Sequence, residues 1–273
     1  MPLKRNARSH VRNTRSRVRK VKTASPIQNS STPSVSVVIP AMNERRTIAL
    51  VIANARKVHP DTEVIVVVNG STDGTEAIAR RMGATVVVYN EALGHDVGRS
   101  VGAGHANGNV ILFTDGDIVI PARKLKPFVT AIEAGTDVAL NRYNGRTKTT
   151  NGHSVVIAKH ALNAALRRDD LAGSSLTTIP HAISRKMLDT VGAAALSVPP
   201  LALTMAIHKG LNVKRVAFVE VGRTNPKRRR RRKNDPLKGL IIGDHLEAME
   251  WVMDQTDLRG GYTDLVRKRD RVR

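Results

Sequence analysis

The sequence has no cysteine and few aromatic residues. Without cysteine, the chain forms no disulfide framework and no cysteine-ligated zinc site. Aromatic residues make up 3% of the chain, so a folded core must be built mainly from Val, Ile, Leu and Ala. The lack of cysteine is consistent with a reducing compartment.

The sequence also has no apolar run of the roughly 18 residues that a membrane-spanning helix needs. Its N-terminus is basic, but no apolar segment follows, which argues against a secretory signal peptide. An organelle transit peptide stays open, because the same segment is basic and contains serine. We expect a cytoplasmic protein without a transmembrane segment, associated at most peripherally with a membrane.

Acidic residues are scarce beside basic ones, and the excess of positive charge is local. The 45 Lys and Arg outnumber the 23 Asp and Glu, which gives a net charge of +22. Nine basic residues lie within 4–22 and seven more within 227–233, and these two segments contain no acid. Such runs attract polyanions, so we expect contact with an anionic membrane or nucleic acid through them. A solubilising role without a partner is an equal alternative.

The chain divides into three regions by composition. Residues 1–34 form a basic arm without apolar periodicity that ends in a Ser/Pro/Asn-rich linker, and we expect them to be disordered. Residues 35–225 carry the regular apolar patterns of one folded domain. Residues 226–273 comprise the second basic run as a loop, followed by a C-terminal helix over 236–255 that packs on the core and can kink at Gly243.

Strand and helix patterns alternate through the first part of the folded region. Short Val/Ile runs predict strands over 35–40, 63–69, 85–89 and 109–114, and helical spacing predicts helices over 43–57, 75–83 and 97–108. The strands are apolar throughout, as in a parallel sheet that helices cover on both faces. The second part is less regular, with helices predicted over 123–135, 154–168, 185–192 and 199–210, and strands over 137–142 and 212–221.

Polar clusters follow three of the predicted strands at their carboxyl ends. They are AMNE at 41–44, NGSTD at 69–73 and DGD at 115–117. Ligands of such sheets bind beyond the carboxyl ends of the strands, so these three loops should converge on one cleft. Asp115 and Asp117 could hold Mg²⁺ or Mn²⁺, which prefer hard oxygen ligands. An ordinary acidic turn is the alternative for these two residues.

Four longer sequence blocks that contain these clusters and their strands resemble the nucleotide-sugar half of family 2 glycosyltransferases. In chain order they are VSVVIPAMNERRTI, EVIVVVNGSTDGT, AIARRMGATVVV and GNVILFTDGDIVI. The resemblance implies a GT-A fold over 35–225 and transfer of a sugar from a UDP- or GDP-type donor to an unidentified acceptor. It implies a nucleotide-sugar site made of Pro40, Ala41, Asn43, Glu44, Asn69, Asp73, Arg99, Asp115, Gly116 and Asp117. Asn69 and Asp73 would hold the base and ribose, and Asp117 would bind the metal.

The sequence departs from the family pattern at two places. Asn69 stands where members often have Asp. Members that invert the sugar also carry an acidic pair near the start of the helix before the last strand, but residues 197–210 contain no acid. We take Asp244 as the candidate base, with Asp189 and Asp170 as weaker ones, and a retaining transfer stays open.

Two histidines and one tryptophan add further candidates. Related GT-A enzymes can add a late His to the metal, which makes His245 a candidate third ligand, and His181 could face the acceptor. For both, an ordinary structural His is the favoured alternative. Trp251, with Met249 and Met253 at helical spacing, is expected to pack in the core.

Two other functional classes compete with transfer. A non-catalytic nucleotide-binding GT-A module, whose basic arms bind a polyanion, would explain the missing acidic pair, although it has little need of the DGD acids. A nucleotidyltransferase should show a Gly-rich phosphate loop after the first strand, and AMNERRTI has no glycine. A glycosyltransferase is therefore the first prediction.

Overall fold

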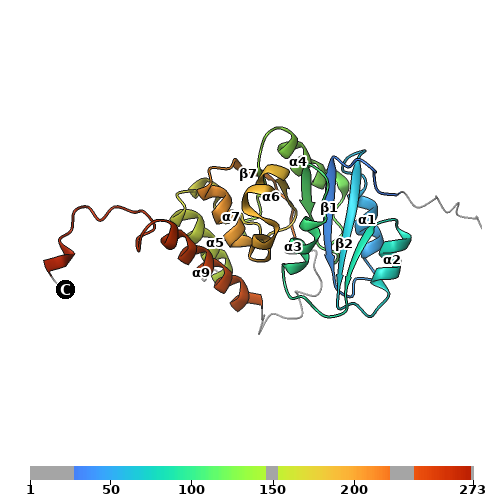
Figure 1. Ribbon diagram of the computed structural model, residues 1–273, viewed down its shortest axis with the longest axis horizontal. Helices are drawn as coiled ribbons and strands as arrows, with labels where there is room; N and C mark the ends of the chain where they lie inside the picture. Colours follow the sequence, from blue (N-terminus) through green and yellow to red (C-terminus); the bar gives the residue numbers. More distant parts are fainter. Residues whose placement is uncertain (1–27, 146–152, 222–236, 272–273) are drawn as a thin grey trace, which may run out of the picture.

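The computed structural model describes residues 28–145, 153–221 and 237–271. A central sheet is covered by helices on both faces, and a long C-terminal helix lies along the side of the molecule away from the first strands (Figure 1). The basic segments 4–22 and 227–233 fall outside the described residues, so their partners stay predictions. Within the described residues, every helix is too short or too polar to cross a bilayer.

The sheet of the described residues has seven strands in the order β3-β2-β1-β4-β6-β5-β7. Their bounds are β1 (Val35–Ala41), β2 (Thr62–Asn69), β3 (Thr85–Tyr89), β4 (Val110–Phe113), β5 (Val138–Asn141), β6 (His181–Ser184) and β7 (Val213–Ala217). All neighbours are parallel except β6, which runs antiparallel to both β4 and β5. The predicted α/β class with a mostly parallel sheet is confirmed.

The helices of the described residues alternate with these strands. They are α1 (Ile48–Ala55), α2 (Thr75–Arg81), α3 (Val97–Gly104), α4 (Ala122–Glu133), α5 (Ser154–Ala165), α6 (Arg185–Val191), α7 (Pro199–His208) and α9 (Leu237–Gln255). Short 3₁₀ turns occur at η1 (Asp169–Leu171), η2 (Ala193–Ser197) and η3 (Arg269–Arg271). Gly83 and Gly192, which follow α2 and α6, have φ of +73° and +87°, which glycine adopts more readily than other residues.

Two apolar cores lie on the two faces of the sheet. On β1, Val37 and Ile39 face the core shared with α1 and α4, while Val38 faces the core shared with α3 and α7. All three are fully buried, and burial of such a side chain contributes about 1.5–3 kcal/mol. Because both faces are covered, the strands are apolar throughout rather than alternating, as the sequence shows.

Helix α3 lies unusually close to the sheet. A Cβ atom at Gly102 would be 2.4 Å from Cγ1 of Val38, and one at Gly98 would be 3.0 Å from Cβ of Pro40. No larger residue fits without displacing the helix or the strand. The glycines of this helix therefore serve close packing, and they bring Arg99, which lies between them, to the end of β1.

Two segment boundaries differ from those predicted. Residues 28–34, which we assigned to the disordered arm, are bonded to the sheet: Asn29 Nδ2 donates to the carbonyl of Val64, and Asn29 Oδ1 accepts from the same residue's N–H. The helix predicted from residue 43 begins only at Ile48. Its expected first turn is a loop, because side chains of the next loop bind the backbone N–H groups of residues 43–45.

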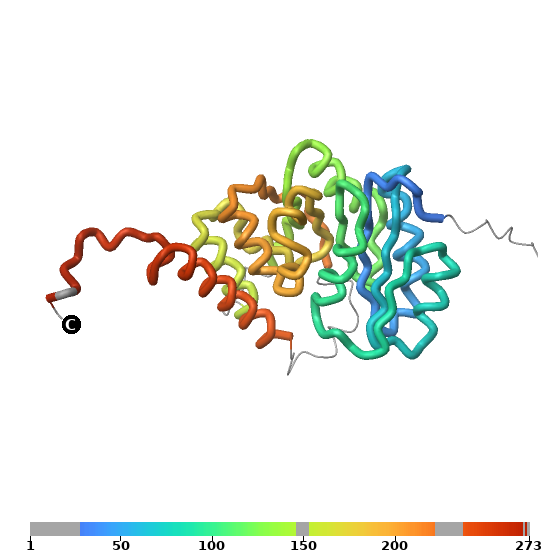
Figure 2. The backbone as a smooth tube through the Cα atoms, in the orientation of Figure 1, coloured from blue at the N-terminus to red at the C-terminus, as the bar shows by residue number. Residues whose placement is uncertain are grey.

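Helix α9 packs on α5 and α7 and buries His245, Ala248 and Val252. It continues through Gly243 without interruption, so the break that this glycine could allow does not occur. Beyond α9, the last described residues leave the body of the molecule, as the tube in Figure 2 shows.

Candidate active site

A cleft of about 320 Å³ opens at the carboxyl ends of β1, β2 and β4. Its size falls within the usual range of small-molecule sites, about 300–1,000 Å³. Its lining residues are Pro40, Ala41, Met42, Glu44, Asn69, Ala92, Gly94, His95, Asp96, Gly98, Arg99, Asp115, Gly116, Asp117 and Leu237. The three polar loops that were predicted to converge thus contribute to one cleft.

Gly116 places the two acids of the DGD segment against the end of β1. The N–H of Gly116 donates to the carbonyl of Pro40 at 3.1 Å, and the carbonyl of Gly116 accepts a hydrogen bond from the hydroxyl of Thr47 at 2.7 Å. A Cβ at position 116 would lie 3.1 Å from Cβ of Ala41 and 3.2 Å from the carbonyl oxygen of Pro40. The glycine therefore allows a contact that fixes Asp115 and Asp117 on either side of it.

Asn43 and Asp73 brace the loops beside the cleft and do not line it. The side-chain oxygen of Asn43 accepts from the N–H of Thr72 at 2.9 Å, and Oδ2 of Asp73 accepts from the N–H of Arg45 at 3.1 Å. Partial burial raises the pKa of Asp73, but hydrogen bonds from Thr75 and Arg45 outweigh this effect and lower it overall. Both residues lock the loop after β1 to the loop after β2.

Arg99 joins two carboxylates inside the protein. One guanidinium nitrogen binds Asp96, and Nη2 lies 2.8 Å from Oδ1 of Asp115. Arg99 is 4% exposed. Burial lowers its pKa, yet Asp115 and Asp96 outweigh burial and raise it, so the guanidinium stays charged. Arg99 therefore orients Asp115 as well as lining the cleft.

Asp115 and Asp117 supply the hard oxygen donors that Mg²⁺ and Mn²⁺ prefer. Within the described residues, no group of three or more His, Asp and Glu side chains could enclose a metal ion. Mg²⁺ commonly uses one or two carboxylates and takes phosphate oxygens and waters for the rest of its shell. The two acids thus fit a metal that is shared with a diphosphate rather than an all-protein cage.

His95 and Asp96 were missed by the sequence analysis. Nε2 of His95 lies 3.4 Å from Oδ2 of Asp96, and Asp96 adopts φ of +65° just before α3. A non-glycine residue in this region is uncommon and often marks a functional site. The polar GHD segment that precedes the Gly-rich helix was the available signal, because it follows the carboxyl end of a third strand, β3.

Asp244 lies near the cleft, whereas His245 points elsewhere. Burial raises the pKa of Asp244 to about 6, and the charges of Asp96 and Glu247 add to the effect, so Asp244 is close enough to Asp96 to interact with it. His245 is buried, and its Nδ1 lies 2.6 Å from the carbonyl of Ile241 on its own helix. It forms no metal-ligand group with Asp115 and Asp117, so its predicted role as third ligand has no support.

The remaining candidates take structural positions. Asp170 is held by Arg168 at 2.7 Å, and this contact lowers its pKa, while Asp189 is exposed on α6. His181 is buried and stacks on Phe113; burial lowers its pKa to about 3, so its ring is neutral.

The C-terminal aromatic cluster is only partly buried. Trp251 packs edge-on against His208 of α7, with ring centroids 5.3 Å apart. Met249 and Trp251 are half-buried, whereas Met253 is 39% exposed, so the core packing expected of these three residues is only partial.

Comparison with known protein families identifies the family to which this cleft belongs. The sequence model of glycosyl transferase family 2 matches residues 36–191, which is more than half of the chain. The chain belongs to glycosyl transferase family 2. The match contains every cleft residue except Leu237, and it ends at the last residue of α6.

Curated relatives of this family 2 chain match less than half of it. Glycosyltransferase AglE of Haloferax volcanii is 34% identical over 131 residues, which cover 45% of this chain and 43% of the relative. A 4,4'-diaponeurosporenoate glycosyltransferase of Staphylococcus aureus is 38% identical over 95 residues, covering 33% of this chain and 25% of the relative. The chain therefore spans less than half the length of these relatives.

Solved structures extend the likeness in fold. Glucosyl-3-phosphoglycerate synthase of Mycobacterium tuberculosis in complex with UDP aligns with a TM-score of 0.60 and 23% identity, over 85% of this chain and 82% of that one. The same synthase with Mn²⁺, UDP and glucosyl-3-phosphoglycerate aligns with a TM-score of 0.58 and 23% identity, over 85% and 81% of the two chains. At this level of identity the comparison establishes the GT-A fold.

Proposed function

We propose that this family 2 chain transfers a sugar from a nucleoside diphosphate sugar of UDP or GDP type to an acceptor. The observation that carries the proposal is the meeting of Asp115 and Asp117 with the ends of β1 and β2 in one cleft. A cofactor of Mg²⁺ or Mn²⁺ at the two acids accompanies it. The crystal structures of the mycobacterial synthase with Mn²⁺ and UDP support this choice by analogy of fold.

Four of the cleft residues then have roles in donor binding. Asp117, with Asp115 beside it, would hold the cation, whose chemistry is to neutralise charge on the departing nucleoside diphosphate. Asp115, fixed by Arg99, is positioned to accept hydrogen bonds from the ribose or the sugar. Asn69, at the end of β2, lines the cleft, and its amide can both donate to and accept from a base.

Acceptor activation requires a group that takes the hydroxyl proton. Helix α7 begins with Pro199 and Pro200 and contributes no acid where inverting members carry one. Asp244 is the acid that we assign as base, because its raised pKa of about 6 leaves it ionised at neutral pH yet basic enough to accept a proton. Asp244 does not itself line the cleft, but it interacts with Asp96, which does, and it lies on α9, whose first residue Leu237 also lines the cleft.

The basic segments complete the proposal from the sequence. Residues 4–22 and 227–233 would hold a cytoplasmic enzyme near an anionic membrane, nucleic acid or acceptor by charge. Attraction of this kind weakens as salt rises.

Replacement of Asp117 by Ala tests the function. We expect a loss of at least a hundredfold in Mn²⁺-dependent turnover of a UDP- or GDP-sugar, because the diphosphate loses its charge neutralisation. Asp189→Ala is the matched control, since it removes an exposed carboxylate on α6. Removal of metal with a chelator should reduce the parent protein to the level of the variant.

A thermal-shift panel of nucleoside diphosphates and their sugars, with and without Mn²⁺, separates the competing functions. A metal-dependent rise in melting temperature with turnover supports the transferase. The same rise without turnover of any donor favours the non-catalytic module, for which the acid-free start of α7 is the motivating observation. Full activity of Asp117→Ala would refute the metal role.

A further inference from the structure

Exposed apolar side chains of the described residues concentrate in the last 35 of them, residues 237–271. Half of the large hydrophobic side chains that are exposed belong to this stretch: Leu240, Leu246, Met253, Leu258, Tyr262, Leu265 and Val266. The most exposed of all are Leu258 at 91%, Val266 at 88% and Leu265 at 78%. Scattered exposed hydrophobics are normal on a protein surface, whereas a concentration of this kind marks an interaction surface.

Helix α9 presents part of this surface. Leu240, Gly243, Leu246, Glu250 and Met253 recur at spacings of three or four residues and therefore share one side of the helix. This exposed face is opposite the residues that pack on α5 and α7. A Cβ at Gly243 would touch no other atom within 4 Å, so a partner could approach the helix backbone closely there.

The residues after α9 are first attached to the body. The hydroxyl of Tyr262 donates to the carbonyl of Ala164 at 2.8 Å, and Nη2 of Arg167 donates to the carbonyl of Gly261 at 2.6 Å. The guanidinium of Arg167 also lies 4.8 Å from the centre of the Tyr262 ring. Beyond this attachment the last described residues lead away from the body (Figures 1 and 2). We call residues 264–271 the C-terminal extension.

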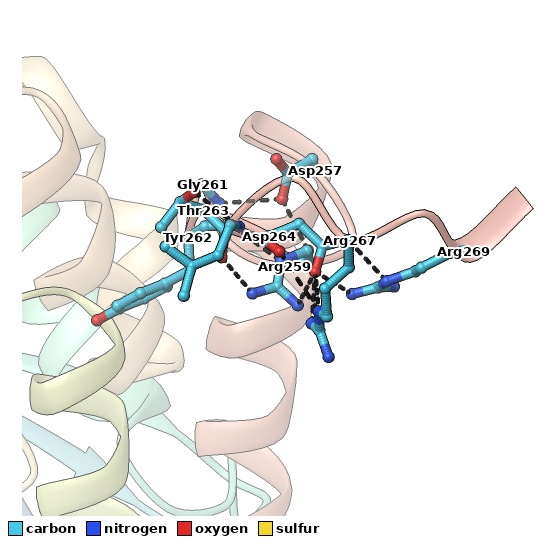
Figure 3. A network of polar contacts seen from close by, with 9 residues as sticks. Asp257, Arg259, Gly261, Tyr262, Thr263, Asp264, Arg267 and Arg269 are labelled. Atoms are coloured by element: carbon cyan, nitrogen blue, oxygen red, sulfur yellow. Dashed lines mark hydrogen bonds and ion pairs between the residues drawn. The ribbon is translucent and has the colours of Figure 1, made fainter.

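The C-terminal extension has a defined shape because arginines converge on Asp264 (Figure 3). Nη2 of Arg267 and Nε of Arg269 lie 2.5 Å and 2.7 Å from its carboxylate, and Arg259 lies 3.6 Å away. Arg259 also donates to the carbonyl of Thr263 at 2.6 Å. This network forms a turn that presents Leu265 to solvent rather than folding it inward.

The backbone of that turn is strained. Leu265 and Val266 have φ of +50° and +57°, and a β-branched residue in this region is a genuine outlier. Such a conformation persists where other contacts stabilise it. The Asp264 network holds the backbone of this turn, yet no side chain of the described residues covers Leu265 or Val266, which are 78% and 88% exposed. Both side chains are therefore placed to contact a further apolar surface.

The charges of the two surfaces are complementary. The C-terminal extension has four basic residues and two acids, a net charge of +2; Arg267 and Arg269 pair with Asp264, and Lys268 and Arg271 are also exposed. The exposed face of α9 carries Glu247, Glu250 and Asp254 beside its apolar residues. An anionic lipid surface would attract the extension but would be repelled by the helix face. A second copy of this chain offers both a basic apolar extension and an acidic apolar face.

We propose that two copies form a two-fold dimer in which the C-terminal extension of each lies along the exposed face of α9 of the other. An interface of this type repeats each contact twice, since residue i meets residue j and j meets i. The lengths are compatible: eight residues span at most about 26–29 Å when fully extended, and the turn at Leu265 and Val266 together with η3 shortens this reach toward the length of the face from Leu240 to Met253, about 20 Å. This proposal is independent of the catalytic function.

The test measures the mass of the full chain in solution by sedimentation equilibrium over a range of concentrations. We expect a dimer, and the double variant Leu265→Ser/Val266→Ser should raise its dissociation constant at least tenfold. Leu246→Ser on α9 should have a similar effect. Leu50→Ser is the matched control, because Leu50 is 58% exposed on α1 and lies outside the proposed interface. Melting temperatures of all variants verify that each remains folded.

A charge exchange tests the pairing itself. Glu250→Lys and Lys268→Glu should each weaken the dimer, and the two together should restore most of its affinity. A parent chain that is monomeric at all concentrations would overturn the proposal, as would a dimer that none of these changes affects. A monomer that binds vesicles containing phosphatidylserine, and loses that binding in Leu265→Ser/Val266→Ser, would assign the surface to lipid instead.

Discussion

Substitution of Gly102 by Ala tests whether close contact between α3 and the sheet builds the candidate site. The added methyl would lie 2.4 Å from Cγ1 of Val38 and 3.2 Å from Cγ2 of Val67. Carbon atoms in contact are about 3.5–4.0 Å apart, so helix or strand must move by about 1 Å. Both valines belong to central strands with little freedom to move, and α3 is the element that we expect to shift.

The expected loss of stability follows from two opposing effects. Overpacking of a well-packed core costs about 1–3 kcal/mol, while replacing Gly by Ala in a helix gains up to about 1 kcal/mol. The net loss is therefore about 1–2 kcal/mol, which corresponds to a fall of roughly 3–6 °C in melting temperature for a chain of this size. Because Arg99 lies one turn before Gly102, the shift should also move Asp115 and weaken Mn²⁺-dependent binding of UDP or GDP several-fold.

Gly104→Ala provides a control on the same helix. It adds the same methyl group at a position where no atom lies within 4 Å, so only the gain in helix propensity remains. We expect an unchanged or slightly higher melting temperature and unchanged nucleotide affinity. Equal melting temperatures for the two variants, measured by calorimetry in one buffer, would refute the view that glycine at 102 is required for packing.

Two further predictions concern the acids near the cleft. Asp96→Asn keeps a side chain that tolerates φ of +65° but removes a negative charge beside the buried Arg99. We therefore expect the Asp96→Asn variant to have a lower melting temperature and weaker nucleotide binding than the control variant Asp189→Asn. Equal values for the two variants would contradict the role of Asp96. In the folded protein the pKa of Asp244 is raised to about 6, above its value in the unfolded chain. As the pH rises from about 4 to 6, Asp244 ionises in the unfolded chain first, and the free energy of unfolding of the protein falls. Asp244→Asn should therefore gain melting temperature relative to the parent at pH 7 and not at pH 3.5, and a constant difference across this range would contradict the raised pKa.

The strands and the three polar loops were predictable because their determinants are local. Continuous Val and Ile runs such as VIVVV in β2 predict a strand buried on both faces, and the parallel order then fixes where the loops lie. The resemblance of the DGD segment and its neighbours to the family gave the same cleft. Local pattern and family signal agreed over residues 35–121, where the fold is most regular.

Roles that depend on tertiary proximity were not predictable in the same way. Asp96 participates in the site because α3 lies close to the sheet, so that Arg99 contacts both Asp96 and Asp115. Residue spacing along the sequence does not predict how closely a helix packs on a sheet. Leu237 reaches the cleft from a helix far along the chain. Conversely, Asn43 and Asp73 belong to the family pattern, but their side chains hold loops together. Sequence reasoning identified the residues without distinguishing ligand contact from support.

Four of the six non-glycine residues with positive φ in the described part of the chain lie beside the cleft or in the C-terminal extension. Non-glycine residues with positive φ include Asn43 and Asp96 beside the cleft and Leu265 and Val266 in the C-terminal extension. Strained conformations are maintained only when surrounding contacts compensate for them, and at the cleft those contacts are visible as hydrogen bonds from the neighbouring loops. At the extension the network around Asp264 fixes the turn, but nothing among the described residues covers Leu265 and Val266. The strain of this turn is thus supported by ion pairs, and it is the exposure of the two apolar side chains that motivates the proposed dimer contact.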